Sequence, residues 1–412
     1  MEKGFFHLMT SEKVRKILEE FSSLGFEEVE LPSALERTAA FDIFSPEDLP
    51  PFARSTMDGY AVRARDVFGA SETEPALLSV VGEIRMGQEP ASLELGPGEA
   101  VKIWTGGILP KGGDAVVMVE YTRSLDPKLI EIYRAVAPSE NVILRGQDCE
   151  KGALCISAGT RLRPQELGLL AGLGITRVRV VKRPCVAIIS TGDEVVSEKE
   201  TPPCGKIRDI NSTTLEALVK KDGGVPKRLG IVPDSFEAIL DACQRALDEG
   251  ADVVLISGGS SVGARDYTLK VFEELTGSPP IVHGVAIRPG KPTIISRYGD
   301  KALFGLPGHV ASCMVVYLLF VRHLLNIYQG LHPETGLKSL KVRCGQMFPS
   351  VTGREDYVRV TLKDSGEGIP EAFPVFGKSG LISTLVKANG LLKIPRDSEG
   401  FHQGEEAEVL LL

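Results

Sequence analysis

The stretch ADVVLISGGSSVGARD, residues Ala251–Asp266, decides the fold class of this chain. It begins with a short apolar run rich in β-branched residues, which is typical of a buried strand in a parallel sheet. The run then breaks into serine and glycine, and the stretch closes on the carboxylate of Asp266. Open α/β sheets bind ligands at this edge, where glycines let backbone N–H groups approach an anion. The stretch therefore predicts phosphate or pyrophosphate chemistry beside a metal-holding Asp.

The sequence around this stretch alternates short apolar runs with helical patterns, which predicts a mostly parallel sheet with helices on both faces. The predicted elements include strands at Val186–Ser190 and Thr293–Ser296 and helices at Ser235–Glu249 and Val310–Tyr328. Two further loops, Thr191–Glu194 and Gly305–Gly308, leave the sheet on the same expected edge. One Gly-rich turn alone is typically only a turn, but three converging loops favour an anion site.

The flanking regions have a different texture. Helical spacing predicts a helix over Thr10–Leu24 with Ser11 as its N-cap. Short alternating runs between Gly and Pro turns predict a β-rich module from about residue 46 to residue 142, and β structure returns after residue 332. The fold class expected is therefore multidomain, α/β plus β.

Composition excludes several classes of protein. The chain has 412 residues with a net charge of −8, which argues against a general nucleic-acid binder. We expect no membrane span, because the longest apolar run, Val310–Leu325, is interrupted by polar residues. The N-terminus lacks a signal-peptide pattern, and seven scattered cysteines fit a reducing cytosol, so a cytoplasmic location is expected. No CxxC pair occurs, and Cys149 and Cys155 are interpreted as ordinary thiols.

Polar side chains gather in several loops. Arg288 and Lys291 lie three residues apart in a Pro/Gly turn and could face one oxyanion, or could form a solvated surface turn. The loop Arg54–Tyr60 is dense in polar groups for a connector, although a plain turn remains open. Oxygen ligands of the kind that Mg²⁺ prefers occur in or beside Gly/Pro-flanked loops, at Asp58, Asp148, Glu194, Asp234 and Asp266.

Taken together, these segments resemble the molybdopterin molybdenumtransferase family, the bacterial MoeA proteins and the E domain of gephyrin. The resemblance covers nearly the whole chain. It rests on the joint order of Arg54–Ala61, Thr105–Gly107, Asp114–Val117, Thr191–Glu194, Ile210–Ser212, Ser257–Gly259, Val262–Gly263, Asp266–Tyr267, Pro289–Pro292 and Gly305–Gly308. It departs from the family where Arg288 replaces a usual Lys, where Ser260 replaces a usual Val, and at His309–Ala311.

The resemblance implies a homodimer of four-domain chains. The expected domains are a small elongated domain with N-terminal helices (1–44 and 146–180), a β-rich domain (45–145), an α/β domain similar to molybdopterin adenylyltransferases (181–331) and a C-terminal β domain (332–412). The implied reaction inserts molybdate into adenylylated molybdopterin and releases AMP, with Mg²⁺ and a molybdopterin adenylyltransferase as partner enzyme.

The resemblance also implies site residues. The functional carboxylates are Asp58, Asp148, Glu194, Asp234 and Asp266, of which Glu194, Asp234 and Asp266 hold the metal. The pterin, AMP and oxyanion contacts are Ser55, Thr56, Thr191, Gly192, Asn211, Ser257, Gly258, Gly259, Ser261, Arg288, Gly290, Lys291, Pro292, Pro307, Gly308, Ser312, Arg354 and Ser379. The alternatives are a tungstate-inserting paralogue, a pterin nucleotidyltransferase or a non-catalytic scaffold.

Overall fold

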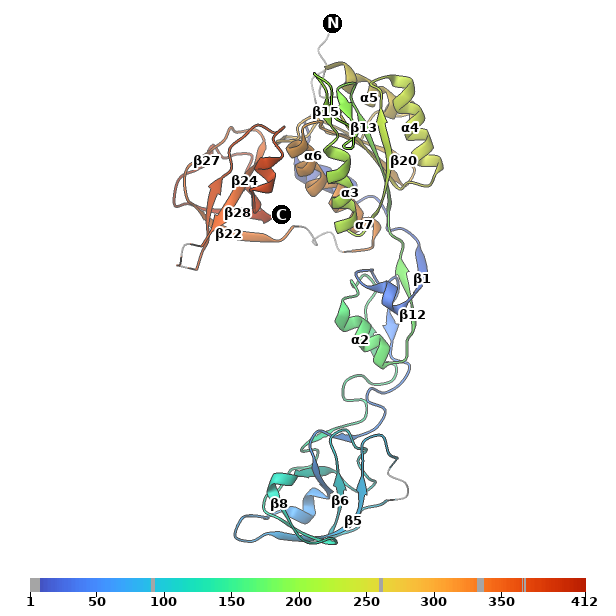
Figure 1. Cartoon of the computed structure of the whole chain (residues 1–412), viewed down its shortest axis with the longest axis vertical. Helices are drawn as coiled ribbons and strands as arrows, with labels where there is room; N and C mark the ends of the chain where they lie inside the picture. Colours follow the sequence, from blue (N-terminus) through green and yellow to red (C-terminus); the bar gives the residue numbers. More distant parts are fainter. Residues whose placement is uncertain (1–7, 90–92, 259–261, 332–336, 365, 367) are drawn as a thin grey trace.

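The structure is a computed structural model that describes residues 8–89, 93–258, 262–331, 337–364, 366 and 368–412, with backbone only for residues 262–266. Gly259 and Ser261 lie outside the described residues, as does the side chain of Asp266. Figure 1 shows an elongated molecule. A β-rich unit lies at one end, a small unit lies in the middle, and an α/β unit lies beside a second β unit at the other end.

The α/β unit is built on a six-stranded sheet in the order β16-β13-β17-β21-β20-β18. Its four parallel strands are β16 (Val225–Val232), β13 (Cys185–Thr191), β17 (Val253–Ser257) and β21 (Lys301–Leu306). The strand β20 (Ile294–Tyr298) pairs antiparallel with both β21 and β18 (Val282–His283). The predicted mostly parallel sheet is therefore confirmed, with β17 at its centre.

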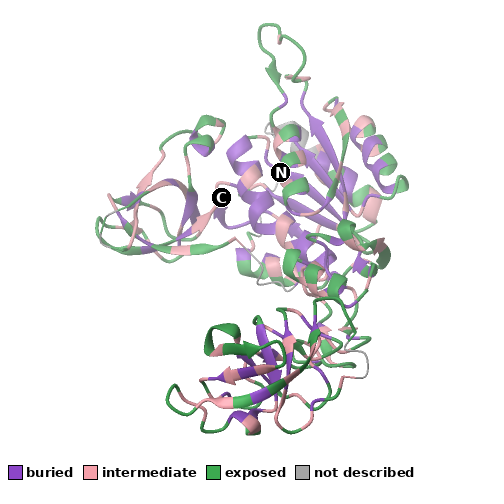
Figure 2. Cartoon of the chain, turned by 60° about the horizontal axis from the view of Figure 1, so that its bottom comes forward, coloured by how far each residue is buried: buried purple, intermediate pink, exposed green. Residues whose placement is uncertain are grey.

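Both faces of this sheet are buried, as Figure 2 shows in purple. Alternate residues such as Ile188 and Leu255 pack on the side of α3 (Asn211–Lys221), and their neighbours Ile189 and Ile256 pack on the other. That second side is covered by α4 (Phe236–Asp248) and α5 (Val262–Thr276). The period of two along each strand thus supplies two cores.

The predicted helix over Val310–Tyr328 is confirmed and contains a π-helical turn. It consists of α6 (Val310–Val316), η4 (Tyr317–Val321) and α7 (Arg322–Tyr328). By length and composition alone this segment could cross a membrane, but most of it is buried inside the protein. It is therefore the core helix of the α/β unit. The first helix, α1 (Ser11–Leu18), is shorter than predicted, and its N-cap is Thr10, whose hydroxyl accepts the Lys13 N–H.

The C-terminal β unit is closed into a barrel. Its strands are β22 (Ser339–Cys344), β24 (Glu355–Lys363), β25 (Glu371–Pro374), β26 (Gly390–Ile394) and β28 (Glu406–Leu411). They pair in the order β24-β25-β22-β28-β26, and β26 pairs with β24 again. The short strand β19 (Ile287–Arg288), which leaves the α/β unit, adds to this barrel beside β24. The pairing of β19 with β24 therefore joins the α/β unit directly to the barrel.

The β-rich unit has a six-stranded sheet in the order β7-β4-β6-β5-β9-β8. These strands are β4 (Gly59–Val62), β5 (Ala76–Ile84), β6 (Glu99–Ile103), β7 (Ala115–Met118), β8 (Thr122–Asp126) and β9 (Leu129–Ile132). The chain enters this unit through β3 (Arg54–Ser55) and leaves it through β10 (Val142–Ile143), and these two strands pair with each other.

The small unit is assembled from two distant segments of the chain. The strand β1 (Phe26–Glu30) pairs with β12 (Arg177–Val181), and β2 (Ile43–Phe44) pairs with β11 (Leu154–Ile156). The helix α2 (Pro164–Gly172) covers this pair of ladders. The exact boundaries of the four expected domains stay a prediction.

Candidate active site

Three loops meet at the carboxyl edge of the α/β sheet, because they follow the adjacent strands β13, β17 and β21. Gly258 has a φ of +145°, and a Cβ built there would lie 2.1 Å from the backbone oxygen of Thr191. Only glycine allows the two loops to approach this closely. The backbone at Gly258 is therefore pressed against the end of the neighbouring strand β13, at the floor of a cavity.

This first cavity has a volume of about 240 Å³ and lies at the strand ends. Its lining includes six predicted residues, Thr191, Glu194, Asn211, Ser257, Gly258 and Gly308. It also includes four that were not predicted as binding residues, Ser190, Arg208, Asp209 and His309. The predicted Gly192 directly follows β13, and Pro307 lines a small space beside Gly258.

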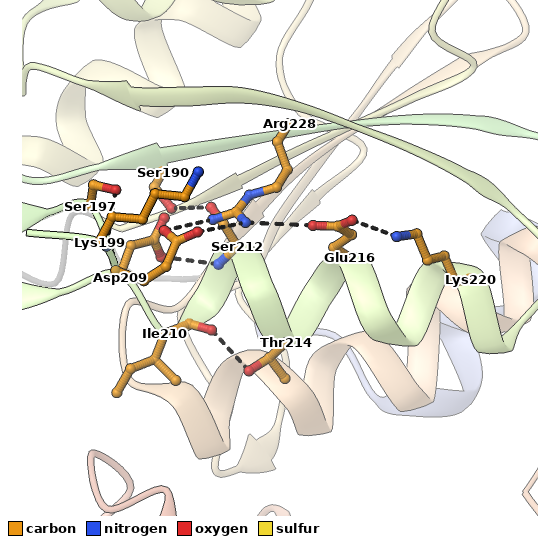
Figure 3. A network of polar contacts seen from close by, with 11 residues as sticks. Ser190, Ser197, Lys199, Asp209, Ile210, Ser212, Thr214, Glu216, Lys220 and Arg228 are labelled. Carbon is orange, nitrogen blue, oxygen red and sulfur yellow. Dashed lines mark hydrogen bonds and ion pairs between the residues drawn. The ribbon is translucent and has the colours of Figure 1, made fainter.

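Buried hydroxyl groups fix the floor of this cavity. The Ser190 hydroxyl lies 2.8 Å from that of Ser212 and 3.3 Å from that of Ser257. The carboxylate of Asp209 accepts the N–H of Ser212 at 3.0 Å, at the start of α3, as Figure 3 shows. The Asn211 amide donates to the Gly308 carbonyl at 2.8 Å and so ties α3 to the third loop. The polar groups are held before any ligand arrives.

Carboxylates crowd one side of the same edge. The N–H of Asp234 donates to the Asp193 carboxylate at 3.4 Å, and the buried Oδ1 of Asp234 has no hydrogen-bond partner. Burial raises the pKa of Asp234, the Thr191 hydroxyl opposes this shift, and the charges of Asp193 and Glu194 add to it. A carboxylate held in this way gains from a nearby cation.

These carboxylates do not make a complete metal site by themselves. Where the structure describes side chains, no three His, Cys, Asp or Glu groups are placed to hold a metal ion together. Mg²⁺, however, is usually held by one or two carboxylates together with water and substrate phosphates. The orphaned oxygen of Asp234 and the nearby Glu194 fit that requirement.

A second cavity of about 530 Å³ lies between the α/β unit and the barrel. Its lining includes seven predicted residues, Arg288, Gly290, Lys291, Pro292, Ser312, Arg354 and Ser379. It also includes Asp356, Arg359 and Lys378, which were not predicted. Five cationic side chains and one carboxylate therefore line it, which suits an anion.

Asp356 organises the cationic wall of this cavity. The register of β19 on β24 places Arg288 opposite Asp356. The Asp356 carboxylate lies 3.4 Å from the Arg288 guanidinium and 3.2 Å from that of Arg354, and it accepts the Ser350 hydroxyl at 2.9 Å. Its side chain is only 4% exposed. One buried carboxylate thus holds two arginines at the cavity.

Comparisons with known proteins agree along the whole chain. Family patterns match at residues 8–174 ("MoeA N-terminal region (domain I and II)"), 187–326 ("Probable molybdopterin binding domain") and 341–412 ("MoeA C-terminal region (domain IV)"). A molybdopterin molybdenumtransferase of Bacillus subtilis is 33% identical over 97% of this chain and 93% of its own length. The chain belongs to the MoeA family.

Other members of the MoeA family support this assignment. A molybdopterin molybdenumtransferase of Nostoc sp. is 35% identical over 93% of this chain and 88% of its own length. The crystal structure of a MoeA protein from Pyrococcus horikoshii superposes with a TM-score of 0.83 at 38% identity, covering 98% and 99% of the two chains. Family membership gives the chain its role in molybdenum cofactor biosynthesis as a molybdenumtransferase, which confirms the resemblance.

Four predicted residues of this MoeA family member lie away from both cavities. Ser55, Thr56 and Asp58 belong to the β-rich unit, which lies at the far end of the molecule in Figure 1. Asp148 follows β10, through which the chain leaves that unit. Ser55 is 2% exposed, and its hydroxyl donates to the Met57 carbonyl at 2.5 Å, so it serves the turn. The Asp58 carboxylate accepts the N–H and hydroxyl of Thr105, each at 2.7 Å, and these bonds lower its pKa.

Proposed function

We propose that this chain inserts molybdate into adenylylated molybdopterin, forming molybdenum cofactor and releasing AMP. The proposal rests on the second cavity. Five cationic side chains and one carboxylate line it, and the first cavity lies next to it at the edge of the sheet. A tetrahedral dianion matches such a wall, because guanidinium and ammonium groups donate several charge-assisted hydrogen bonds to it. Arg288, Lys291 and Arg354 supply the charge, and the hydroxyls of Ser312 and Ser379 add donors.

The first cavity is the proposed site of the pterin nucleotide. Its floor offers the hydroxyls of Ser190 and Ser257 and the backbone of Gly258, next to the first turn of α3. Because the Ser212 N–H at the start of α3 already donates to the Asp209 carboxylate, the proposed phosphate contacts are these hydroxyls and the Gly258 backbone. We assign the phosphate-linked part of the substrate to this cavity. Its two ring systems, the pterin and the adenine, would then lie at the rims of the cavity.

The two cavities are neighbours, which supports transfer between them. The neighbouring residues Ser379 and Gly380 line the second and the first cavity respectively, and so do Ser312 and Val310. The Ala311 N–H donates to the Ser379 carbonyl at 3.0 Å and closes this shared wall. An oxyanion in one cavity and a phosphate-linked pterin in the other would therefore be held on two sides of one thin partition.

Mg²⁺ is the proposed metal, held by Asp234 and Glu194, with Asp266 as a further ligand. When bound, it offsets negative charge on the pyrophosphate. The chain itself holds the pyrophosphate through the backbone of its glycine loops and orients the oxyanion through Arg288 and Arg354. No nucleophilic side chain is required for either task.

The β-rich unit is proposed to act on the partner subunit of a homodimer, where Asp58 and Asp148 would complete the site. The substrate would come from a molybdopterin adenylyltransferase, and we expect a cytoplasmic location with neither nucleic-acid nor membrane binding.

The test supplies purified protein with adenylylated molybdopterin and Mg²⁺, with and without molybdate, and follows AMP by chromatography. We expect AMP release only with molybdate, and loss of that release in Arg354→Ala but not in the exposed control Arg396→Ala. AMP release that needs no oxyanion would contradict the transferase proposal and favour a nucleotide hydrolase. Repeating the assay over a range of tungstate concentrations decides whether the second cavity prefers molybdate or tungstate.

A further inference from the structure

Two cysteines lie close together in residues 144–156, called here the connector, through which the chain passes from the β-rich unit to the small unit. The sulfur atoms of Cys149 and Cys155 lie 3.0 Å apart, and both residues are partly exposed. Of the remaining cysteines, Cys243, Cys313 and Cys344 are buried. Neither cavity is lined by the connector pair, so the proposed reaction leaves this pair unexplained.

The backbone holds this pair in place from both ends. The N–H of Leu49 donates to the Cys149 carbonyl at 2.7 Å, and the N–H of Cys149 donates back to the Leu49 carbonyl at 3.1 Å. Cys155 lies in β11 at a β-bulge, between Leu154 and Ile156, which both pair with β2. Between them the chain turns at Gly152, whose φ is +84° and whose N–H donates to the Ser45 carbonyl at 2.8 Å. Cys149 is thus held by two backbone hydrogen bonds to Leu49, and Cys155 is held through its neighbours in β11.

We propose that Cys149 and Cys155 form an intramolecular disulfide bond when a small-molecule disulfide oxidises the protein, and that this bond stiffens the connector. A disulfide bond is about 2.05 Å long, so the two sulfurs need to approach by only about 1 Å. Disulfides in reducing compartments are usually transient and redox-sensing, and a partly exposed pair of this kind is accessible to an oxidant.

The chemistry balances with glutathione disulfide as oxidant. The Cys149 thiolate attacks one sulfur of glutathione disulfide, forms a mixed disulfide and releases one glutathione thiolate. Cys155 then loses its proton, attacks the Cys149 sulfur and releases the second glutathione. Two protein thiols are oxidised, and one glutathione disulfide is reduced to two thiols. Burial and the Cys149 sulfur raise the pKa of Cys155 to about 11, so Cys149 is the better initial nucleophile.

The sequence offers a sharp test, because Lys151 lies between the two cysteines. Full-length protein is incubated with glutathione disulfide, its remaining thiols are alkylated, and it is digested with trypsin without reduction. We expect mass spectrometry to find peptides 146–151 and 152–161 joined, and separated after reduction. Oxidised protein in which these peptides carry only glutathione or alkyl groups would overturn the proposal.

Variants separate this pair from the other thiols. Cys204→Ser removes an exposed cysteine elsewhere and is expected to leave the linkage intact. Cys155→Ser is expected to stop at the mixed disulfide on Cys149. Stiffening is read by amide hydrogen exchange over residues 144–156, which we expect to slow by about tenfold in the oxidised protein and not in oxidised Cys155→Ser. Equal exchange before and after oxidation would overturn the stiffening.

Discussion

Asp356 shows how one buried carboxylate can shape a site meant for anions. It repels an oxyanion, yet it contacts the guanidinium groups of both Arg288 and Arg354. Arginine side chains are long and flexible, and fixing them in advance reduces the ordering cost of binding. Asp356 is therefore a positioning residue, because it fixes the guanidinium groups of Arg288 and Arg354 at the cavity.

Replacing this carboxylate tests that role. In Asp356→Asn, the side chain keeps its size but loses the charge that pairs with both arginines. A hydrogen bond to a charged group contributes about 1.5–3 kcal/mol, so we expect KM for molybdate to rise by about tenfold or more. Steady-state AMP release measures this, with the exposed Asp397→Asn as the control for charge. A KM that stays the same or falls would argue against positioning.

Gly258 gives a second prediction at the scale of one residue. In Gly258→Ala the new Cβ meets the Thr191 carbonyl oxygen, so the two loops must separate. We expect the free energy of unfolding in urea to fall by about 1–3 kcal/mol and AMP release to be lost. Gly250→Ala is the matched control, since Gly250 also has a positive φ but has open space where a Cβ would lie. Equal effects of both changes would show that the close approach is unimportant.

At the scale of elements, the contact of α1 with α7 carries a pH dependence. His323 on α7 is 10% exposed at its side chain and lies 3.5 Å from Glu19, just after α1. Burial lowers the pKa of His323, and the negative charge of Glu19 opposes that shift only in part. The folded protein therefore binds a proton less readily than the unfolded chain does.

The sign of the effect follows from this difference. As pH falls through the unfolded pKa of about 6.5, the unfolded chain takes up a proton that the folded protein resists, so stability is lost. A single group can contribute a slope of up to about 1.4 kcal/mol per pH unit. We expect His323→Gln to lose less stability than the unmodified protein between pH 7 and pH 5.5 in urea unfolding. Parallel pH profiles would contradict this.

The same elements show what the sequence could and could not predict. The helix predicted over Thr10–Leu24 ends at Leu18 in the structure. Phe21 is buried although it lies beyond the helix, so burial of an apolar residue at helical spacing did not require helical geometry there. Its apolar spacing therefore continued the pattern without continuing the helix. The strand β17 was predicted correctly, and the structure describes only Gly258 of the loop residues that follow it. Apolar runs and glycines are local signals, which is why the sequence alone could locate them.

Other site residues carry no local signal. Asp356 comes to lie beside Arg288 in the second cavity only through the register of β19 on β24, two strands that are far apart in the sequence. Arg208 in the short strand β15 (Ile207–Arg208) and Asp209, just before α3, line the first cavity, and no glycine motif marks them. Arg354 and Ser379 were predicted only from the family resemblance. Their positions in the sequence alone would not have predicted that they line the same cavity as Lys291.

At the scale of the whole molecule, the distance between the β-rich unit and the cavities demands a second chain if Asp58 acts in the site. We expect light scattering to show a dimer. Mixing Asp58→Ala with Lys291→Ala chains should then restore activity, since a heterodimer has one site with both residues intact. Random pairing predicts about a quarter of the unmodified activity. No recovery, despite heterodimer formation, would place Asp58 outside the partner's site.

The pairing of β3 with β10 has a consequence for domain engineering. It places the entry and exit of the β-rich unit side by side, with Ser55 opposite Val142. Neighbouring strands lie about 5 Å apart, so the whole unit can be excised and the gap closed by a tight turn. The excision removes the six-stranded sheet of the β-rich unit and leaves the strand pairings of the other units in place. The position between β3 and β10 should therefore accept a foreign domain in place of the β-rich unit.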